Sequence, residues 1–258
     1  MSTTAKRALG WVTTPPFLAA FGLVLALFDP LQRLAFLLGG RRPHEWVVAL
    51  LQSSLKEALR LCGTRFAVER DGGVRPGTPY VLVANHQSMF DIPIVASYLV
   101  SNFPKYVSKR ELARGIPSIS FNLRHGGNAL IDRADRAQAV AAIAELGRSA
   151  QARGVSVVIY PEGTRARDGT MGPFRPAGTL ALLEAAPDLA VVPVAIDGSW
   201  ELLRWRLRPV PFGTRIRVRL GAPIARRPGE DREALVGRCE REVRETLARW
   251  RGGPREGR

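Results

Sequence analysis

The chain alternates between short runs of consecutive apolar residues and longer stretches in which apolar residues recur every three or four positions. Runs such as 155–160, apart from one serine, and 191–196 are continuously apolar, which is typical of strands covered on both faces of a sheet. Residues 215–220 alternate strictly, so we expect a half-exposed strand with three arginines on one face. The expected strands are 65–70, 80–84, 106–108, 128–131, 155–160, 191–196 and 215–220. The expected helices are 45–62, 92–100, 135–153, 180–186 and 230–250.

Strands and helices that alternate along one chain are typical of an α/β fold, in which helices flank a central sheet. The 258 residues suffice for one sizeable domain with a small appendage, and no internal repeat or low-complexity linker divides them. We therefore expect a single α/β domain with a central, mostly parallel sheet over residues 63–258. A helical segment over residues 1–62 precedes it.

The amino-terminal segment is apolar enough to interact with a membrane. The uncharged stretch 8–28 is long enough to span a bilayer, although two prolines at 15 and 16 interrupt it. Asp29-Pro30 then separates a second apolar run, 31–38. Two short apolar runs joined at a proline predict a helical hairpin embedded in one leaflet, or an interfacial helix pair. A spanning helix and a helical pair buried within the domain are the alternatives.

The composition adds a strong positive charge to this picture. The formal net charge is +15, and 46% of the residues are hydrophobic, so the chain has the balance of a globular protein with an acidic partner. That partner could be nucleic acid, an anionic membrane surface, or an acidic small molecule or carrier protein. The two cysteines lie far apart, and the three histidines and two cysteines show no ligand spacing, so neither a disulfide nor a zinc site is indicated.

His86 and Asp91 form the first candidate catalytic pair. On one continuous helix, five residues apart, their side chains would point roughly 140° away from each other. They can meet if His86 lies in the turn after the strand 80–84 and Asp91 lies in the first turn of the next helix, with Ser88 as its N-cap. The pair would then be a base with a carboxylate that orients it. A histidine near an aspartate is more often a simple polar contact, so the pair alone does not establish catalysis.

Four turns are expected to meet beyond the carboxyl ends of the strands: 85–91, 109–110, 132–133 and 161–165. They would bring the base and its carboxylate close to several cations, which suits deprotonation of a neutral nucleophile near an anion. No G-x-S-x-G or G-x-x-x-x-G-K motif occurs, so neither a serine nucleophile nor nucleotide hydrolysis is supported. His86 would then act directly on a substrate hydroxyl.

Four ordered motifs within about 80–199 strengthen this hypothesis. They are the H-x-x-x-x-D at His86 and Asp91, the strand end Ile131-Asp132-Arg133, the turn Glu162-Gly163-Thr164-Arg165, and the buried strand Val192-Pro193-Val194-Ala195-Ile196. Together they resemble the glycerolipid acyltransferase family, whose commonest bacterial members are 1-acylglycerol-3-phosphate acyltransferases. Two departures stand out. Tyr160 replaces the usual phenylalanine before the proline, and Arg175-Pro176-Ala177-Gly178 lacks the lysine that usually precedes the glycine, which puts the acceptor headgroup in question.

The resemblance implies a role for each of these residues. His86 would be the catalytic base and Asp91 its partner. Arg165, Lys109 and Arg133 would bind the phosphate of the acceptor, and the loop residues Glu162, Gly163 and Thr164 would support the oxyanion. The family needs no metal and no cofactor, because the acyl-CoA or acyl carrier protein is a co-substrate.

The resemblance also implies the partners and the location. The acceptor would be a lysophospholipid, with lysophosphatidic acid first, and the donor an acyl thioester, including acyl carrier protein. The protein would lie on the cytoplasmic face of the bacterial inner membrane, monotopic or with one span, and would bind no nucleic acid. Three alternatives remain: the same chemistry on another lysolipid such as a lyso-ornithine lipid, a silent lipid-binding scaffold, and a basic nucleic-acid-binding domain. The last has no module signature to support it.

Overall fold

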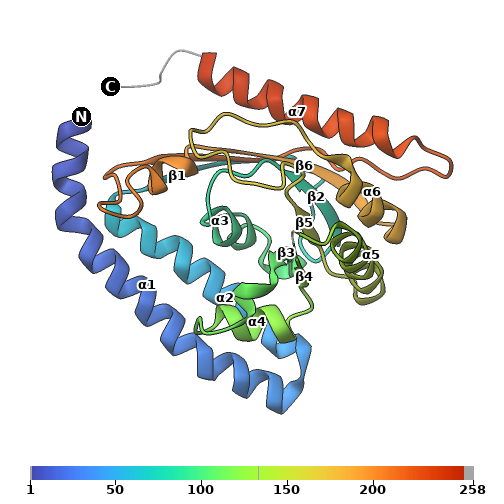
Figure 1. The fold of residues 1–258 in the computed structure, drawn as a ribbon, viewed down its shortest axis with the longest axis horizontal. Helices are drawn as coiled ribbons and strands as arrows, with labels where there is room; N and C mark the ends of the chain where they lie inside the picture. Colours follow the sequence, from blue (N-terminus) through green and yellow to red (C-terminus); the bar gives the residue numbers. More distant parts are fainter. Residues whose placement is uncertain (1, 133, 253–258) are drawn as a thin grey trace.

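A seven-stranded sheet with the order β1-β7-β6-β2-β5-β3-β4 runs through the computed structural model, which describes residues 2–132 and 134–252 (Figure 1). Strands β6, β2, β5, β3 and β4 are parallel to one another, whereas β7 is antiparallel to β6 and β1 is parallel to β7. The predicted mostly parallel sheet is confirmed. The strands are β1 (Arg65–Arg70), β2 (Tyr80–Ala84), β3 (Lys105–Lys109), β4 (Ala129–Ile131), β5 (Val157–Ile159), β6 (Ala190–Asp197) and β7 (Arg215–Leu220).

Helices cover both faces of the sheet. The α-helices are α1 (Thr3–Gly39), α2 (Arg41–Ala58), α3 (Asp91–Ser97), α4 (Ile119–His125), α5 (Arg136–Arg153), α6 (Pro176–Ala185) and α7 (Arg232–Gly252). The short 3₁₀ helices are η1 (Leu59–Cys62), η2 (Val100–Asn102), η3 (Arg110–Ala113) and η4 (Ser199–Leu203). Most ends differ from the expected ones by a few residues. The largest shifts are in α2 and α6, which both begin four residues earlier than expected; α6 begins at Pro176, and proline is well tolerated in the first helical turn.

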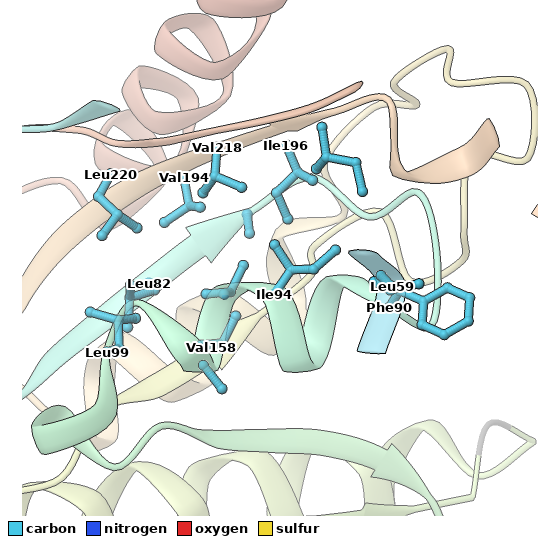
Figure 2. Packing of buried hydrophobic residues seen from close by; sticks show 14 of the residues in the cluster. Leu59, Leu82, Phe90, Ile94, Leu99, Val158, Val194, Ile196, Val218 and Leu220 are labelled. Atoms are coloured by element: carbon cyan, nitrogen blue, oxygen red, sulfur yellow. The ribbon is translucent and has the colours of Figure 1, made fainter. Parts of the chain in front are cut away.

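The alternation of side chains along the central strands builds two separate cores. Leu82 and Val194 face α3 and belong to the same buried cluster as Ile94 of that helix (Figure 2). Val81 and Val83 of the same strand β2 point to the opposite face, where they join the apolar side chains of α5, α6 and α7. Because β2 is buried on both faces, its carboxyl end is held firmly from both sides, and this is the end that leads into His86.

The expected turn at Asp29-Pro30 was wrong. Helix α1 continues through all three of its prolines to Gly39, and α2 doubles back along it after Gly40 (Figure 1). Tertiary contacts hold the helix at this point: the Ser118 hydroxyl donates to the Leu25 carbonyl, and the Ser118 amide donates to the Asp29 carboxylate. A proline removes one helical hydrogen bond, which packing of this kind can outweigh. The two apolar runs therefore form one continuous helix and not the predicted hairpin, and the chain reverses only at Gly40, before α2.

A buried ionic cluster ties α2 to the sheet. Glu45 of α2 accepts from the Lys105 ammonium at 2.9 Å and from the Arg153 guanidinium, and the Glu45 and Lys105 side chains are almost fully buried. Burial lowers the pKa of Lys105 to about 8, against an opposing effect of Glu45. Lys105 thus carries a cost of desolvation that the ion pair offsets in part.

This lowered pKa predicts how stability depends on pH. Between about 8 and 10.5 the unfolded chain binds a proton at Lys105 that the folded chain has lost, so the free energy of unfolding should rise with pH across this window. Unfolding in detergent at pH 8 and at pH 10.5 measures the rise. In Lys105→Met, where Glu45 keeps Arg153 as a partner, the rise should be smaller. Equal rises in the two proteins would contradict the prediction.

Candidate active site

The turns that the sequence marked for chemistry follow β2, β5, β3 and β4, which are parallel neighbours in the sheet. Because the carboxyl ends of parallel strands meet at one edge, these turns gather there. His86 follows β2, and Pro161 opens the turn after the adjacent β5. Lys109 ends β3, two strands from β2 and therefore about 10 Å across the sheet, with an exposed side chain. Arg133, after β4, lies outside the described residues.

The structure brings His86 and Asp91 into direct contact. Nδ1 of His86 lies 2.8 Å from Oδ2 of Asp91, and the same oxygen accepts from the amides of Gln87 at 2.7 Å and Ser88 at 2.8 Å. Asp91 is fully buried, whereas the His86 side chain is 15% exposed. A carboxylate at Nδ1 keeps the proton on that nitrogen and leaves the lone pair on Nε2. Within the described residues, Nε2 takes part in no hydrogen bond.

The turn between the two side chains differs in one detail from the sequence prediction. Helix α3 begins at Asp91 itself, and Phe90 occupies the position before it, so Ser88 is not the N-cap. The Ser88 hydroxyl instead accepts from the Phe90 amide at 3.1 Å and closes a tight turn. The Asp91 carboxylate reaches back to the amides of this turn, which lie before the helix, so it holds the turn in place and does not cap the helix.

Glu162 braces the histidine turn against the neighbouring loop. Its Oε1 accepts from the His86 amide at 2.6 Å, and its Oε2 accepts from the Gly172 amide at 2.8 Å. The His86 carbonyl in turn accepts from the Ala166 amide at 2.8 Å. Burial raises the pKa of Glu162, while the two amides act in the opposite direction. The backbone of His86 is thus fixed on both sides by the loop that carries Arg165.

Arg165 lies at the exposed tip of this loop. Among the described residues it forms no ion pair, so the simple alternative of a structural pair with Glu162 is not what the structure contains. Gly163 has a left-handed φ of 68°, and its amide donates to the Tyr160 carbonyl at 3.0 Å. Within the described chain the amides of Thr164 and Arg165 donate to no acceptor. These two amides, together with the guanidinium, leave donors available for an anion.

Tyr160 and Arg175, which the sequence marked only as departures, both lie in the site. The Tyr160 ring stacks on the His86 imidazole with centroids 4.1 Å apart and planes 21° apart, a contact that either tyrosine or phenylalanine can make. Burial raises the pKa of Tyr160 well above its ordinary value, so the ring remains neutral. A Cβ on Gly163 would lie 4.0 Å from Nη1 of Arg175, which places this guanidinium beside the loop in spite of the missing lysine.

The arrangement suits proton transfer close to an anion. Nε2 of His86 is open on one side, and a loop with the exposed arginines Arg165, Arg167 and Arg175 lies next to it. Among the described residues these three guanidinium groups form no ion pair, so they are free to bind a phosphate. No group of three or more candidate metal ligands occurs in the described part of the chain.

Comparisons with known proteins agree with this chemistry. The family profile described as Acyltransferase matches residues 65–197, just over half of the chain. Human 1-acyl-sn-glycerol-3-phosphate acyltransferase beta is 28% identical over 75% of this chain and 69% of its own length. The coconut 1-acyl-sn-glycerol-3-phosphate acyltransferase is 27% identical over 60% of this chain and 48% of its own length. The chain therefore spans about half to seven tenths of these two curated relatives.

The fold has a counterpart among solved structures. The crystal structure of the 1-acyl-sn-glycerophosphate acyltransferase PlsC from Thermotoga maritima superimposes with a TM-score of 0.80, covering 97% of this chain and 100% of that one at 21% identity. The family profile covers β1 to β6, and this stretch contains the His86–Asp91 pair and the Glu162–Arg165 loop. The chain belongs to the acyltransferase family.

Proposed function

We propose that this protein transfers a fatty acyl group from a thioester, acyl-CoA or acyl carrier protein, to the sn-2 hydroxyl of 1-acylglycerol-3-phosphate, making phosphatidic acid for phospholipid biosynthesis. The observation that carries the proposal is the open Nε2 of His86, held in place through Asp91 and lying next to the unpaired arginines of the Arg165 loop. The names of the relatives support the choice of acceptor. No metal or cofactor is required for this chemistry.

The reaction follows from the geometry of the site. Nε2 of His86 takes the proton of the acceptor hydroxyl while its oxygen attacks the thioester carbonyl. The tetrahedral intermediate collapses, the carbon–sulfur bond breaks, and the thiolate takes the proton from the imidazolium. Asp91 stabilises the imidazolium between these steps, and the amides of Thr164 and Arg165 stabilise the oxyanion. A positioned base of this kind contributes roughly 10²–10⁴-fold, which suffices for a reactive thioester held in place.

Helix α1 would hold the protein on the membrane. It is long and apolar enough to cross a bilayer, and only 11% of its most apolar window is buried. However, contacts with the domain are spread along it, from the Lys6 carbonyl at Phe212 to Asp29 at Ser118, over roughly 35 Å of helix. A helix held along the domain in this way suits insertion parallel to one leaflet. Its exposed apolar face contains Trp11, Val12, Leu18, Leu23, Leu27, Leu31, Leu34, Leu37 and Leu38.

The arrangement we propose is monotopic, with the arginines of the site binding a lipid phosphate at the surface of the leaflet. The thioester donors are soluble, so we place the protein on the cytoplasmic face of the inner membrane.

The first prediction concerns the base. His86→Ala should lower acceptor-dependent thiol release from an acyl-CoA by about 10²-fold or more, because the hydroxyl then loses its proton acceptor. The assay uses purified protein in detergent, with and without 1-acylglycerol-3-phosphate. His125→Ala, which changes a partly buried histidine of α4, is the matched control and should keep its activity. Near-normal release by His86→Ala would rule out the mechanism.

The second prediction concerns the acceptor phosphate. Arg165→Ala should raise the KM for 1-acylglycerol-3-phosphate about tenfold with a smaller change in kcat, because it removes a charge that binds the acceptor before and during the reaction. The KM for an uncharged monoacylglycerol should change little. Arg148→Ala removes an exposed arginine of α5 and serves as the control. An unchanged KM for the phosphorylated acceptor would remove the role of Arg165.

The third prediction concerns membrane binding. The double variant Leu27→Glu/Leu31→Glu should reduce co-flotation with vesicles of phosphatidylethanolamine and phosphatidylglycerol about tenfold or more, because two exposed leucines of the face proposed to enter the leaflet become charged. Ala137→Glu/Ala141→Glu places the same charges at the same spacing on the exposed face of α5. Equal loss of flotation in both variants would show that charge, and not the apolar face of α1, decides binding.

A further inference from the structure

The Asp91 carboxylate has a second partner on the side away from His86. Its Oδ1 accepts from the Ser199 hydroxyl at 2.5 Å, while Oδ2 is shared by His86 and two amides. Ser199 is fully buried and comes from η4, more than a hundred residues further along the chain. None of the chemistry described so far uses this hydroxyl.

The backbone around Ser199 is shaped to present it to Asp91. Gly198 follows β6 with a φ of 88°, and a Cβ at this position would lie 2.1 Å from the Arg215 carbonyl oxygen of β7. Only glycine fits such a close approach in a left-handed conformation. The chain therefore turns sharply at the end of β6, and this turn places the first residue of η4 beneath the carboxylate.

The residue before this turn is anchored as well. Asp197, the last residue of β6, accepts from the Arg251 guanidinium of α7 at 2.6 Å, and the same guanidinium donates to the Gly169 carbonyl at 2.7 Å. The side-chain amide of Gln87 donates to the Asp197 carboxylate at 3.4 Å. The position of Ser199 is thus fixed from α7 and from the histidine turn, which is more support than one buried hydroxyl would need for packing alone.

The Ser199 hydroxyl has one proton, and its geometry decides where the proton goes. Asp91 Oδ1 lies at 2.5 Å and Gln87 Oε1 at 3.4 Å, so the proton is donated to Asp91. This bond restrains rotation of the carboxylate about its own axis. It also satisfies an oxygen that has no access to water. The orientation of Oδ2 toward Nδ1 of His86 depends on both effects.

We infer that Ser199 is a positioning residue of the acyl transfer, the third member of a Ser199–Asp91–His86 chain that orients the base through its carboxylate. The inference rests on the proposed function, because His86 must be the base for its orientation to matter. Ser199 itself touches neither substrate. It acts by fixing the carboxylate and by sharing its negative charge.

The test must separate this role from a contribution to folding. In Ser199→Ala, kcat should fall about tenfold or more, with the KM of both substrates changed less than about twofold. The acid limb of the kcat–pH profile should move to higher pH, because the charge of Asp91 is no longer shared with a hydroxyl. Ser156→Ala is the matched control: this serine is equally buried, and its oxygen accepts from the Tyr80 amide at the far end of β2. It should leave kcat and the pH profile unchanged.

A second measurement does not depend on turnover. The chain has three histidines, so ¹⁵N-histidine labelling gives a simple spectrum in which the His86 signals are those absent from His86→Ala. The Nδ1–H resonance of His86 should shift in Ser199→Ala and stay in place in Ser156→Ala. The titratable groups around the imidazole (Asp91, Tyr160 and Glu162) are the same in both variants, so a shift reports on the lost hydroxyl.

The outcomes are distinct for the two proposals. A wild-type protein that releases no thiol with any lysolipid acceptor would overturn the proposed function, whatever the spectrum shows. An active wild type together with a Ser199→Ala variant that keeps its kcat, its pH profile and its Nδ1–H resonance would overturn the role of Ser199 and leave the proposed function standing. A lower kcat with an unmoved pH profile and resonance would also overturn it, because that result describes a loss of folded protein.

Discussion

The Asp91 carboxylate is fully buried, and a buried charge is tolerated only where hydrogen bonds replace the water it has lost. Its two oxygens receive four donors: the His86 ring, the amides of Gln87 and Ser88, and the Ser199 hydroxyl. Hydrogen bonds to a charged group are worth about 1.5–3 kcal/mol each, so this set is the strongest local constraint on the histidine turn. Each donor needs a fixed backbone behind it, and the surrounding elements provide that backbone.

A second buried carboxylate joins the two loops of the site. Glu162 binds the amides of His86 and Gly172, so the loop that presents Arg165 cannot move without disturbing the base. The proposed base, His86, and the proposed phosphate-binding residue, Arg165, therefore belong to one connected unit, although they follow different strands. This arrangement matters for a reaction in which the hydroxyl and the phosphate belong to one small acceptor, because a shift of about 1 Å between the two contacts would misplace the attacking oxygen.

The amino-terminal helix α1 has two different sides. One side of α1 packs on the domain through Phe17 and the contacts of Thr14 and Asp29, while the other side exposes a long apolar face. The packed side fixes the angle of the helix, and the exposed side then sets how the domain would rest on a leaflet. The positively charged chain is consistent with that surface, because anionic lipids attract exposed arginines.

The sequence by itself determined the elements and their chemistry. The apolar runs of β2 and β6 and the strict alternation of β7 predicted these strands to within one residue, and the spacing of His86 and Asp91 allowed only a turn followed by a helix. The path of α1 was not determined, because prolines weaken a helix locally while the contacts that keep it continuous come from Ser118. A local sequence pattern indicates the conformation that one segment prefers. It does not indicate which tertiary contacts a distant segment makes with it.

Contacts between distant segments also account for the features of the site that only the tertiary structure decided. Glu162 braces His86 across two neighbouring strands. Ser199 reaches Asp91 because β6 lies next to β2 and Gly198 turns the chain at its end. None of these contacts follows from residue spacing, since each depends on the order of strands in the sheet. The sequence was sufficient to identify the proposed base and its carboxylate. The order of strands in the sheet decided which groups hold them in place.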